Sequence, residues 1–503
     1  MGQLFREGET RIRPGISYRY SNRGQDLTPG AIDGINAFVM NAQWGPVGEV
    51  VALTSAKSVK DTFGESASVD AAMAIFAGGA NTVYAYRPAG KDFVGDGGAV
   101  IVRTGAAGTV MLDNKLTVSA KYPGDYSLQV VVRSKAWDPL KKELLISVGT
   151  LVKETHIIDV GGDEVNKFCE AINKSSNYVT AAPVMHIPGE GEAPEEEGSN
   201  GNGDLPEGAE IANGAVGDCT GTLEGGVTPI LTADDYKDGF EALAPYQYGF
   251  LSVDSVDSNV VGTLKEYVDE ANAGGKLIVG VTGSNPEAGD SMDDRCTAAR
   301  KLDSAAMVYL GNGYVDGNDN SIEGVQAIAY TAGMISAAPS SQSIVHTVIP
   351  GAVDLTERLT NAQYEKGILN GVLLLSVSPD GQVWYDSGVN TLITPSPLQD
   401  DGWKKIKRVK VRNELLDRMD RCLAKKIGKV SCDTDGIADV LQGGIGVMNE
   451  MIGEHKLRQG STMYLDPDAP PQADSVWFVI DADDIDSLEK LYLHYQFRYS
   501  QNV

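Results

Sequence analysis

The side chains from Leu491 to Ser500, within the last thirteen residues of the chain, alternate between an apolar face and a second face. Leu491, Leu493, Tyr495, Phe497 and Tyr499 fall on one face of this pattern. Such alternation predicts a half-buried β-strand, because successive side chains of a strand point to opposite faces. Chain ends usually fray, so a terminal strand this apolar must pair with something. One partner is its own sheet; the other, which the rest of the sequence favours, is a neighbouring subunit joined by strand addition.

Strand and helix patterns alternate through two other parts of the chain. Near the N-terminus, a strand at 35–40 is followed by a helix at 69–76, which Gly78-Gly79 closes, and by a strand at 82–86. After residue 227 the patterns predict helices at 233–242, 260–271, 293–302 and 321–337, with strands at 248–253, 276–281 and 306–310 between them. This order is typical of a doubly wound α/β core with a largely parallel sheet.

A different pattern interrupts this core from about residue 97. Short strands are expected between Gly, Pro and Asp turns, at 100–102, 116–120, 128–132 and 144–148, with one helix at 165–174 after them. Such spacing predicts a small inserted β-sandwich or barrel. Residues 187–226 hold ten acidic residues and no Lys or Arg. We interpret them as a solvated surface loop, with a binding tail for a basic partner as the alternative.

The C-terminal part predicts helices at 403–427 and 437–457 and a strand at 476–480. Eleven basic and four acidic residues lie between 401 and 430, which makes this segment +7 in a chain of net charge −27. On a helical wheel one face is apolar, with Leu415, Leu416, Met419, Leu423 and Ile427. Another face carries a basic stripe of Arg418, Arg421, Lys425 and Lys429. The stripe is either a solvated face or a docking surface for an acidic partner.

Composition narrows the class of protein. A length of 503 residues allows about three domains, and the net charge of −27 argues against a nucleic acid as the main partner. The five cysteines are scattered and odd in number, which indicates free thiols in a reducing cytoplasm. The N-terminus lacks the apolar region of a signal peptide, and no apolar run of about 18 residues occurs. These features predict a soluble protein made in a cytoplasm.

Motifs of catalysis and cofactor binding are mostly missing from the sequence. Residues 311–317 imitate a dinucleotide loop, but the third Gly is one place late and no helix start follows, so a turn is the better interpretation. There is no P-loop, no zinc-binding helix and no nucleophile elbow. His346 fits an ordinary strand residue better than a general base, and residues 481–486 lack the Gly and Glu of a calcium loop. No catalytic residue, metal or cofactor is expected.

Several stretches, in order along nearly the whole chain, together resemble the sheath proteins of contractile phage tails and phage-tail-like particles. They are Ala37-Phe38-Val39, Trp44-Gly45-Pro46, Phe63-Gly64, Phe76-Ala77-Gly78-Gly79-Ala80, Leu116–Gly124, Thr331–Ile335, Gly371-Val372-Leu373, Gly388–Leu392, Trp403-Lys404-Lys405-Ile406 and Ile427-Gly428-Lys429. The resemblance rests on the ordered set of motifs rather than on any one of them. Residues 193–227 have no counterpart in the family, so nothing is carried over to them.

The resemblance implies a subtilisin-like doubly wound core without proteolytic function, an inserted β domain, a C-terminal α+β domain and extended terminal β arms. In this sequence the expected parts are an N-terminal arm at 1–25, the first part of the core at 26–96, the inserted domain at 97–226, the rest of the core at 227–395, the C-terminal domain at 396–486 and the C-terminal arm at 487–503.

It also implies a function. Family subunits form stacked sixfold rings around an inner tube made of a different protein, together with baseplate and tail terminator proteins. The extended sheath is metastable, and it contracts by rigid-body movement of its subunits to drive the tube through a target envelope. Neither nucleic acid nor direct membrane insertion is expected, and the protein would be made in a bacterial host cytoplasm for a phage tail or a released particle.

Two sets of residues are the expected contact sites. Subunits would be linked by the C-terminal strand from Leu491 to Tyr499 and by the N-terminal arm, with Ile12, Ile16, Tyr18 and Tyr20. The candidates for contact with the tube are Arg418, Arg421, Lys425, Lys429, Lys456 and Arg458. Two alternatives from other classes stay open: a divergent hydrolase with a scattered triad that includes His346, and a cell-surface module whose β domain binds glycan.

Overall fold

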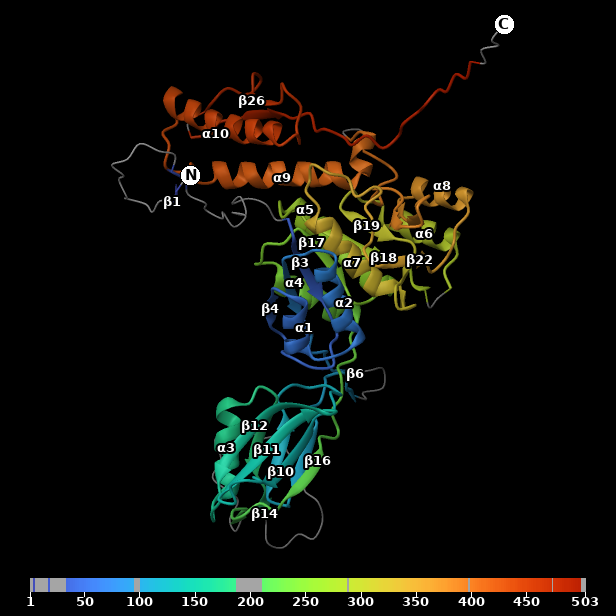
Figure 1. The fold of residues 1–503 in the computed structure, drawn as a ribbon. Helices are drawn as coiled ribbons and strands as arrows, with labels where there is room; N and C mark the ends of the chain where they lie inside the picture. Colours follow the sequence, from blue (N-terminus) through green and yellow to red (C-terminus); the bar gives the residue numbers. More distant parts are fainter. Residues whose placement is uncertain are drawn as a thin grey trace. The chain divides into compact units, whose positions relative to one another are not determined.

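The computed structural model describes residues 3–4, 17–18, 33–94, 100–186, 210–286, 289–396, 399–472 and 474–498 (Figure 1). The chain divides into two compact units. One comprises residues 33–409 and 486–503, and the other comprises residues 1–32 and 410–485. Of the expected N-terminal arm at 1–25, only residues 3–4 and 17–18 are among the described residues. Within the described part of the chain, no helix is both long enough and apolar enough to cross a membrane.

A seven-stranded sheet organises the larger unit. Its strand order is β23 (Val372–Leu373), β19 (Met307–Leu310), β18 (Val279–Gly283), β17 (Phe250–Val253), β3 (Ile35–Val39), β5 (Thr82–Tyr86) and β4 (Val50–Leu53). All neighbours are parallel except β4, which pairs antiparallel with β5 at one edge. The α/β class and the largely parallel sheet predicted from the sequence are therefore observed.

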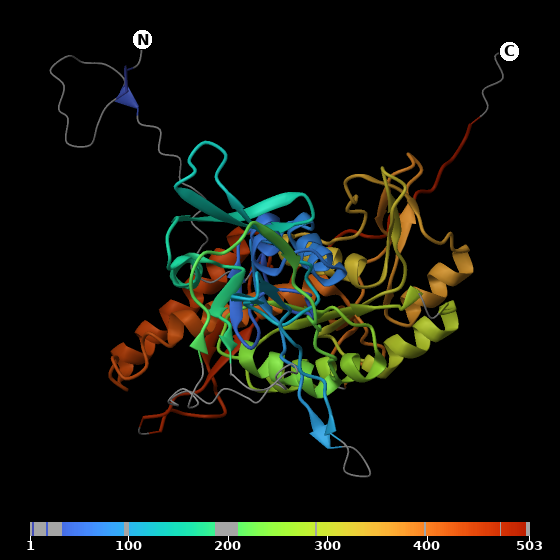
Figure 2. The ribbon, with the colours of Figure 1, turned by 90° about the horizontal axis from the view of Figure 1, so that it is seen from below.

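Helices cover both faces of this sheet. Phe38 of β3 packs in a cluster with α2 (Ala67–Ala77) and α7 (Gly324–Ala337), whereas its neighbour Val39 packs in a cluster with α4 (Ala233–Leu243), α5 (Ser258–Ala273) and α6 (Met292–Leu302). Figure 2 shows the green to yellow-green helices α4, α5 and α6 along one side of the sheet. The alternation of side chains along a strand places consecutive residues in different layers. The core is thus a three-layer α/β/α arrangement.

Helices α2 and α7 approach each other at backbone distance. A Cβ atom on Gly333 would lie 2.0 Å from the carbonyl oxygen of Ile75, and one on Gly78 would lie 2.3 Å from the carbonyl oxygen of Tyr330. Only glycine fits at such a crossing. Gly78 is also the residue that ends α2, as predicted. The contact locks the two helices together as one rigid layer.

The described residues 109–186 and 210–222 contain two antiparallel sheets around a hydrophobic cluster that also includes Trp44. One has the order β12 (Leu151–Asp159), β11 (Lys141–Val148), β10 (Gln129–Ser134) and β16 (Cys219–Thr222); the other has β13 (Val179–Pro183), β9 (Leu116–Ala120) and β8 (Thr109–Leu112). Helix α3 (Glu164–Ser175) buries Val165, Phe168 and Ile172 in the same cluster. The predicted strands and helix of this region are present, whereas β8, β12, β13 and β16 were not predicted.

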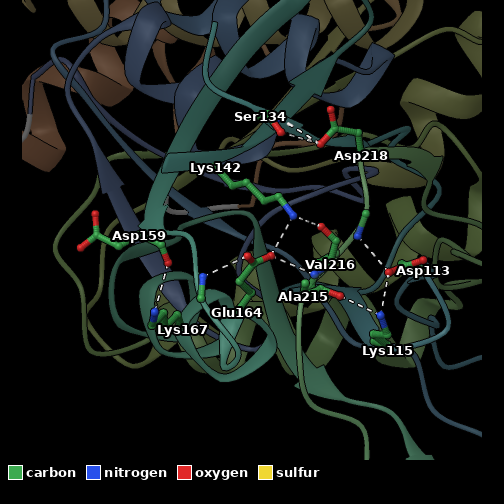
Figure 3. A network of polar contacts seen from close by, with 12 residues as sticks. Asp113, Lys115, Ser134, Lys142, Asp159, Glu164, Lys167, Ala215, Val216 and Asp218 are labelled. Carbon is green, nitrogen blue, oxygen red and sulfur yellow. Dashed lines mark hydrogen bonds and ion pairs between the residues drawn. The ribbon is translucent and has the colours of Figure 1, made fainter. Parts of the chain in front are cut away.

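A polar network holds residues 215–217 against this domain (Figure 3). The fully buried carboxylate of Glu164 accepts hydrogen bonds from Lys142 Nζ at 2.8 Å and from the Val216 amide at 2.9 Å. Burial alone would raise the pKa of Glu164, but these bonds outweigh it and lower the pKa. Lys115 Nζ donates to the carbonyl oxygen of Ala215 at 2.7 Å.

These contacts correct one expectation. Residues 187–226 do not all form a solvated loop, because β15 (Glu210–Ile211) pairs with β14 (Met185–His186) and β16 joins the four-stranded sheet. Residues 187–209 lie outside the described residues. The composition of residues 187–226 is too polar for the segment to fold alone, but its last part adds to an existing sheet and buries Val216 there.

The main elements of the smaller unit are α9 (Ile406–Leu423, whose first turn belongs to the larger unit), α10 (Thr434–Gly453) and a hairpin of β26 (Thr462–Leu465) and β27 (Phe478–Asp481). Its apolar cluster includes Leu415, Met419 and Met448. The expected apolar face was partly wrong, since Leu416 is 49% exposed and Ile427 is 78% exposed. The helix ends at Leu423, and the buried residues follow the i, i+4 spacing of Val411, Leu415 and Met419.

The remaining described elements are shorter. They are β1 (Gln3–Leu4), β2 (Ser17–Tyr18), α1 (Ala56–Phe63), β6 (Phe93–Val94), β7 (Val100–Ile101), β20 (Tyr314–Asp316), β21 (Ser321–Ile322), β22 (Ala352–Leu355), α8 (Asn361–Leu369), β24 (Leu375–Val377), β25 (Val383–Tyr385) and the 3-10 helix η2 (Asp401–Lys404). The expected helix at 321–337 begins instead at Gly324, because residues 321–322 pair with β20 as β21.

Candidate assembly surfaces

The chain end after β27 is tied to the larger unit at its base. Lys405 Nζ lies 2.6 Å from a carboxylate oxygen of Asp486 and 2.9 Å from one of Glu489. Burial alone would raise the pKa of Asp486, but the hydrogen bond and charge of Lys405 outweigh it and lower the pKa. The position of the chain just before the terminal residues is therefore fixed by one lysine and two carboxylates.

Beyond this base, residues 491–498, called here the terminal segment, form no strand in the described chain. On its predicted apolar face, Leu491 is 70% exposed, Leu493 60%, Tyr495 71% and Phe497 94%. Its ring contact and hydrogen bond join only members of the segment, the Tyr495–Phe497 stack and Gln496 to His494. Pairing with its own sheet is thus not observed among the described residues. Pairing with a neighbour stays a prediction, and Tyr499 lies outside the described residues.

The basic residues of α9 do not form one exposed stripe. Arg418 is 9% exposed and donates to Glu454 at 2.8 Å and to Glu414 at 2.5 Å. Lys456, also buried, lies 2.7 Å from each of the same two carboxylates. These four residues, Glu414, Arg418, Glu454 and Lys456, form a closed charged ring. Although burial opposes it, hydrogen bonding to Glu454 and Glu414 raises the pKa of Arg418.

The charged ring joins α9 to the end of α10 within the smaller unit. Two of the six expected tube contacts, Arg418 and Lys456, are therefore buried and paired inside their own chain. Breaking such a buried pair leaves an uncompensated charge, which is costly. The signal that could have indicated this was the i, i+4 spacing of Glu414 and Arg418, which favours pairing on a helix.

The other expected tube contacts lie closer to solvent. Lys425 and Lys429 are exposed, and both follow the end of α9 rather than continuing it. Arg421 Nε lies 3.0 Å from Asp417, with 39% of its side chain exposed, and Arg458 Nε lies 3.4 Å from Asp483, with 64% exposed. Arg421, Lys425 and Lys429 thus lie at or near the turn between α9 and α10, whereas Arg458 follows α10.

Only one of the expected N-terminal contacts is described. Tyr18 lies in β2, which pairs in parallel with β1. Ile12, Ile16 and Tyr20 lie outside the described residues. The arm therefore stays a prediction.

The described residues show no catalytic arrangement around His346, the residue proposed for the hydrolase alternative. The ring of His346 stacks on that of Trp384, with 4.0 Å between the centroids, and no described hydroxyl or carboxylate is hydrogen-bonded to it. In the 311–317 turn, a Cβ atom on Gly313 would lie 2.4 Å from the carbonyl oxygen of Ile322, so that glycine is explained by packing within the chain. Among the residues that the structure describes, no cluster of three or more His, Cys, Asp or Glu could hold a metal ion.

The fold and these surfaces define an α/β protein in which the apolar residues 491–498 pair with no other strand among the described residues. Residues 231–391 match the family model described as the phage tail sheath protein central domain. The resemblance to contractile tail sheath proteins that the sequence indicated is therefore confirmed. No curated protein matches the chain.

Solved structures share the fold over nearly the whole length. The sheath tail protein from Desulfitobacterium hafniense has a TM-score of 0.67 and 18% identity, covering 94% of this chain and all of its own. The sheath tail protein from Listeria innocua has a TM-score of 0.60 and 19% identity, covering 90% of this chain and 95% of its own. The PVC sheath complex of an extracellular contractile injection system, in its contracted state, has a TM-score of 0.51 and 8% identity, with coverage of 97% and 98%.

Proposed function

We propose that this chain is the structural sheath subunit of a contractile injection tail. It polymerises helically around an inner tube in a metastable extended state and contracts by rigid-body rearrangement of its subunits, without acting as an enzyme. Contacts that repeat from one copy to the next without closing generate such a helical polymer. The subtilisin-like assignment of the core and the sixfold ring arrangement are part of the same proposal.

The observation that carries the proposal is the exposure of the apolar side chains of the terminal segment. The side chains of Leu491, Leu493, Tyr495 and Phe497 are exposed, and the segment has no strand pairing to any described residue. An unpaired apolar strand is a template for pairing with another chain. Backbone hydrogen bonds to a neighbour would hold copies together while their folded units reorient. Lys405, which ties Asp486 and Glu489, would transmit the pull of a neighbour to the larger unit.

The β26–β27 hairpin is a candidate acceptor for that segment. It is a two-stranded sheet in the described chain, and such a sheet is marginally stable on its own. Tyr464, Leu465 and Ile480 on its strands are 37–41% exposed. Another strand added to an edge of the hairpin would complete the sheet and cover apolar surface.

The turn between α9 and α10 is the candidate contact with the inner tube. Lys425 and Lys429 are exposed there, and Arg421 is partly so. Exposed charge pairs are each worth about 0–1 kcal/mol. Several such pairs can set the position of a sheath on its tube and still separate when the sheath contracts. Baseplate and terminator proteins complete the set of proposed partners.

Negative-stain electron microscopy of two purified forms tests the proposal. The full chain should form long tubular polymers, and a chain that ends at Lys490 should remain a folded monomer with an unchanged far-ultraviolet circular dichroism spectrum. A full chain that stays monomeric at high concentration, or a shortened chain that still forms the same tubes, would contradict the proposal.

A further inference from the structure

A tight loop of the antiparallel domain presents two large apolar side chains to solvent. Residues 135–140 connect β10 to β11 and, together with Lys141 at the start of β11, are called here the Trp137 loop. Trp137 is 96% exposed and Leu140 is 74% exposed. Val160, whose amide donates to the carbonyl oxygen of Leu140 at 2.8 Å, is 41% exposed. Together they form an apolar patch at a loop tip, which no contact within the described chain explains.

The loop is held in one conformation by its own backbone. The amide of Lys135 donates to the carbonyl oxygen of Lys141 at 3.0 Å, and the Lys141 amide donates to that of Asp138 at 3.0 Å. The Asp138 amide donates back to the carbonyl oxygen of Lys135 at 3.1 Å, and its carboxylate accepts from the Leu140 amide at 3.2 Å. A preorganised loop loses little entropy when it binds, and an exposed Trp on such a loop is typical of an interface anchor.

The larger unit offers a groove of matching chemistry. It has a volume of about 790 Å³ and lies between α2 and the β20–β22 strands. Its apolar lining includes Met73, Phe76 and Ile322, and its charged residues are Asp70 and Asp316. No Lys or Arg is among the described residues that line it. The groove is therefore both apolar and acidic.

We propose that the Trp137 loop of one copy docks into this groove on a second copy. Trp137 and Leu140 supply apolar surface to its lining. Lys135 supplies positive charge to Asp70 and Asp316, while Lys141 lies 4.0 Å from Asp138 within the loop and balances that carboxylate. The volume lies within the range of about 300–1,000 Å³ that is typical of binding sites, and one Trp buries about 150–250 Å². The match of charge and apolar surface favours a second copy as the occupant. This contact rests on the proposed self-assembly. It would be a second contact between copies, made by side chains, besides the pairing of the terminal segment with a neighbour.

Cysteine cross-linking between two populations tests which copy the loop contacts. Both populations carry Cys432→Ser, which removes the exposed native thiol. One then carries Ala136→Cys, at an exposed position of the loop that leaves Trp137 in place, and the other carries Gln326→Cys, at a residue that lines the groove. Mixed and concentrated under mild oxidation, they should give a disulfide-linked dimer that neither population gives alone. A dilute chain that carries both substitutions should not cross-link within itself; an internal disulfide there, or no dimer in the mixture, would overturn the proposal.

A matched set of substitutions measures the effect on assembly. Trp137→Ser removes the anchor, and Gly317→Trp fills the groove, where the nearest atom to an added Cβ is 3.8 Å away. Each should raise the protein concentration needed for polymerisation about tenfold or more. The controls are Leu369→Ser, at a side chain that is 77% exposed, and Gly262→Trp, where an added Cβ meets no atom within 4 Å; both should polymerise like the parent chain.

The outcomes separate this contact from the sheath role. Normal tubes from Trp137→Ser and Gly317→Trp would leave the sheath role intact and overturn the loop contact. A parent chain without tubes would overturn the sheath role, and cross-linking of the mixed populations would still decide whether the loop binds a second copy.

Discussion

Two charge substitutions in the terminal segment should separate assembly from folding. Phe497 is 94% exposed and Leu493 is 60% exposed, so neither contributes much to the stability of its own subunit. Burying a large apolar side chain is worth about 1.5–3 kcal/mol. If a neighbour covers both, the double variant Leu493→Asp/Phe497→Asp loses about 3 kcal/mol or more at every joint. Because 1.4 kcal/mol is a factor of ten, the protein concentration needed for polymerisation should rise by about 100-fold or more.

The assay is sedimentation of polymer over a concentration series, together with thermal unfolding of the monomer. The monomer should unfold within about 1 °C of the parent, because surface substitutions usually change the free energy of unfolding by less than about 0.5 kcal/mol. Leu369→Asp, at a side chain 77% exposed at the end of α8, is the control and should polymerise normally. The reasoning is refuted if the double variant polymerises like the parent, or if its monomer is strongly destabilised.

Three further predictions concern charged groups. Glu414→Gln should lower the free energy of unfolding, measured with a chemical denaturant, by about 3 kcal/mol, because Lys456 and Arg418 both lose the charge of a buried carboxylate. Lys405 lowers the pKa of Asp486 in the folded protein. Their pair therefore adds stability above the pKa of about 3.9 that the carboxyl has in the unfolded chain, and this stability is lost as the pH falls through its pKa in the folded chain. Proteolysis at the base of the terminal segment should therefore increase below about pH 4. Reversing the charge of Lys425 and Lys429 should impair assembly of extended sheath on tubes and spare tube-free polymer, as seen by electron microscopy.

Each of these predictions has a control. Glu365→Gln removes an exposed carboxylate of α8 and should leave the free energy of unfolding unchanged. Lys405→Gln should make proteolysis at the base insensitive to pH between about 3 and 5, and a persisting pH response would mean that another group is responsible. Equal loss of tube-bound and tube-free polymer on reversal of Lys425 and Lys429 would mean that they serve contacts between subunits instead.

Local periodicity predicted the α/β core well. The strand at 82–86 has the expected bounds, and the helix at 233–242 is one residue longer than expected, because each lies in a buried layer with an unambiguous period. Strand β4 and helix α1 were not predicted. In β4 only Leu53 is buried, and in α1 only Val59 and Phe63 are, so little apolar pattern marks either element.

The charged surfaces were harder to predict. The helical wheel assumed a helix that continued to Ile427, whereas α9 ends at Leu423 and a turn with Gly428 at φ +72° follows. Burial of Arg418 depends on Glu454, which is 36 residues away in the sequence, and a wheel of one helix carries no information about such a partner. The Trp137 loop and the acidic groove were missed for a related reason, since exposure is a property of the fold.

Hydrogen–deuterium exchange of residues 491–498, measured in monomer and in polymer, tests the central claim most directly. If another copy completes the sheet, these amides should exchange freely in the monomer and be strongly protected in the polymer, while α7 stays protected in both. Protection already complete in the monomer, or free exchange in a well-formed polymer, would show that the terminal segment is not the joint between subunits.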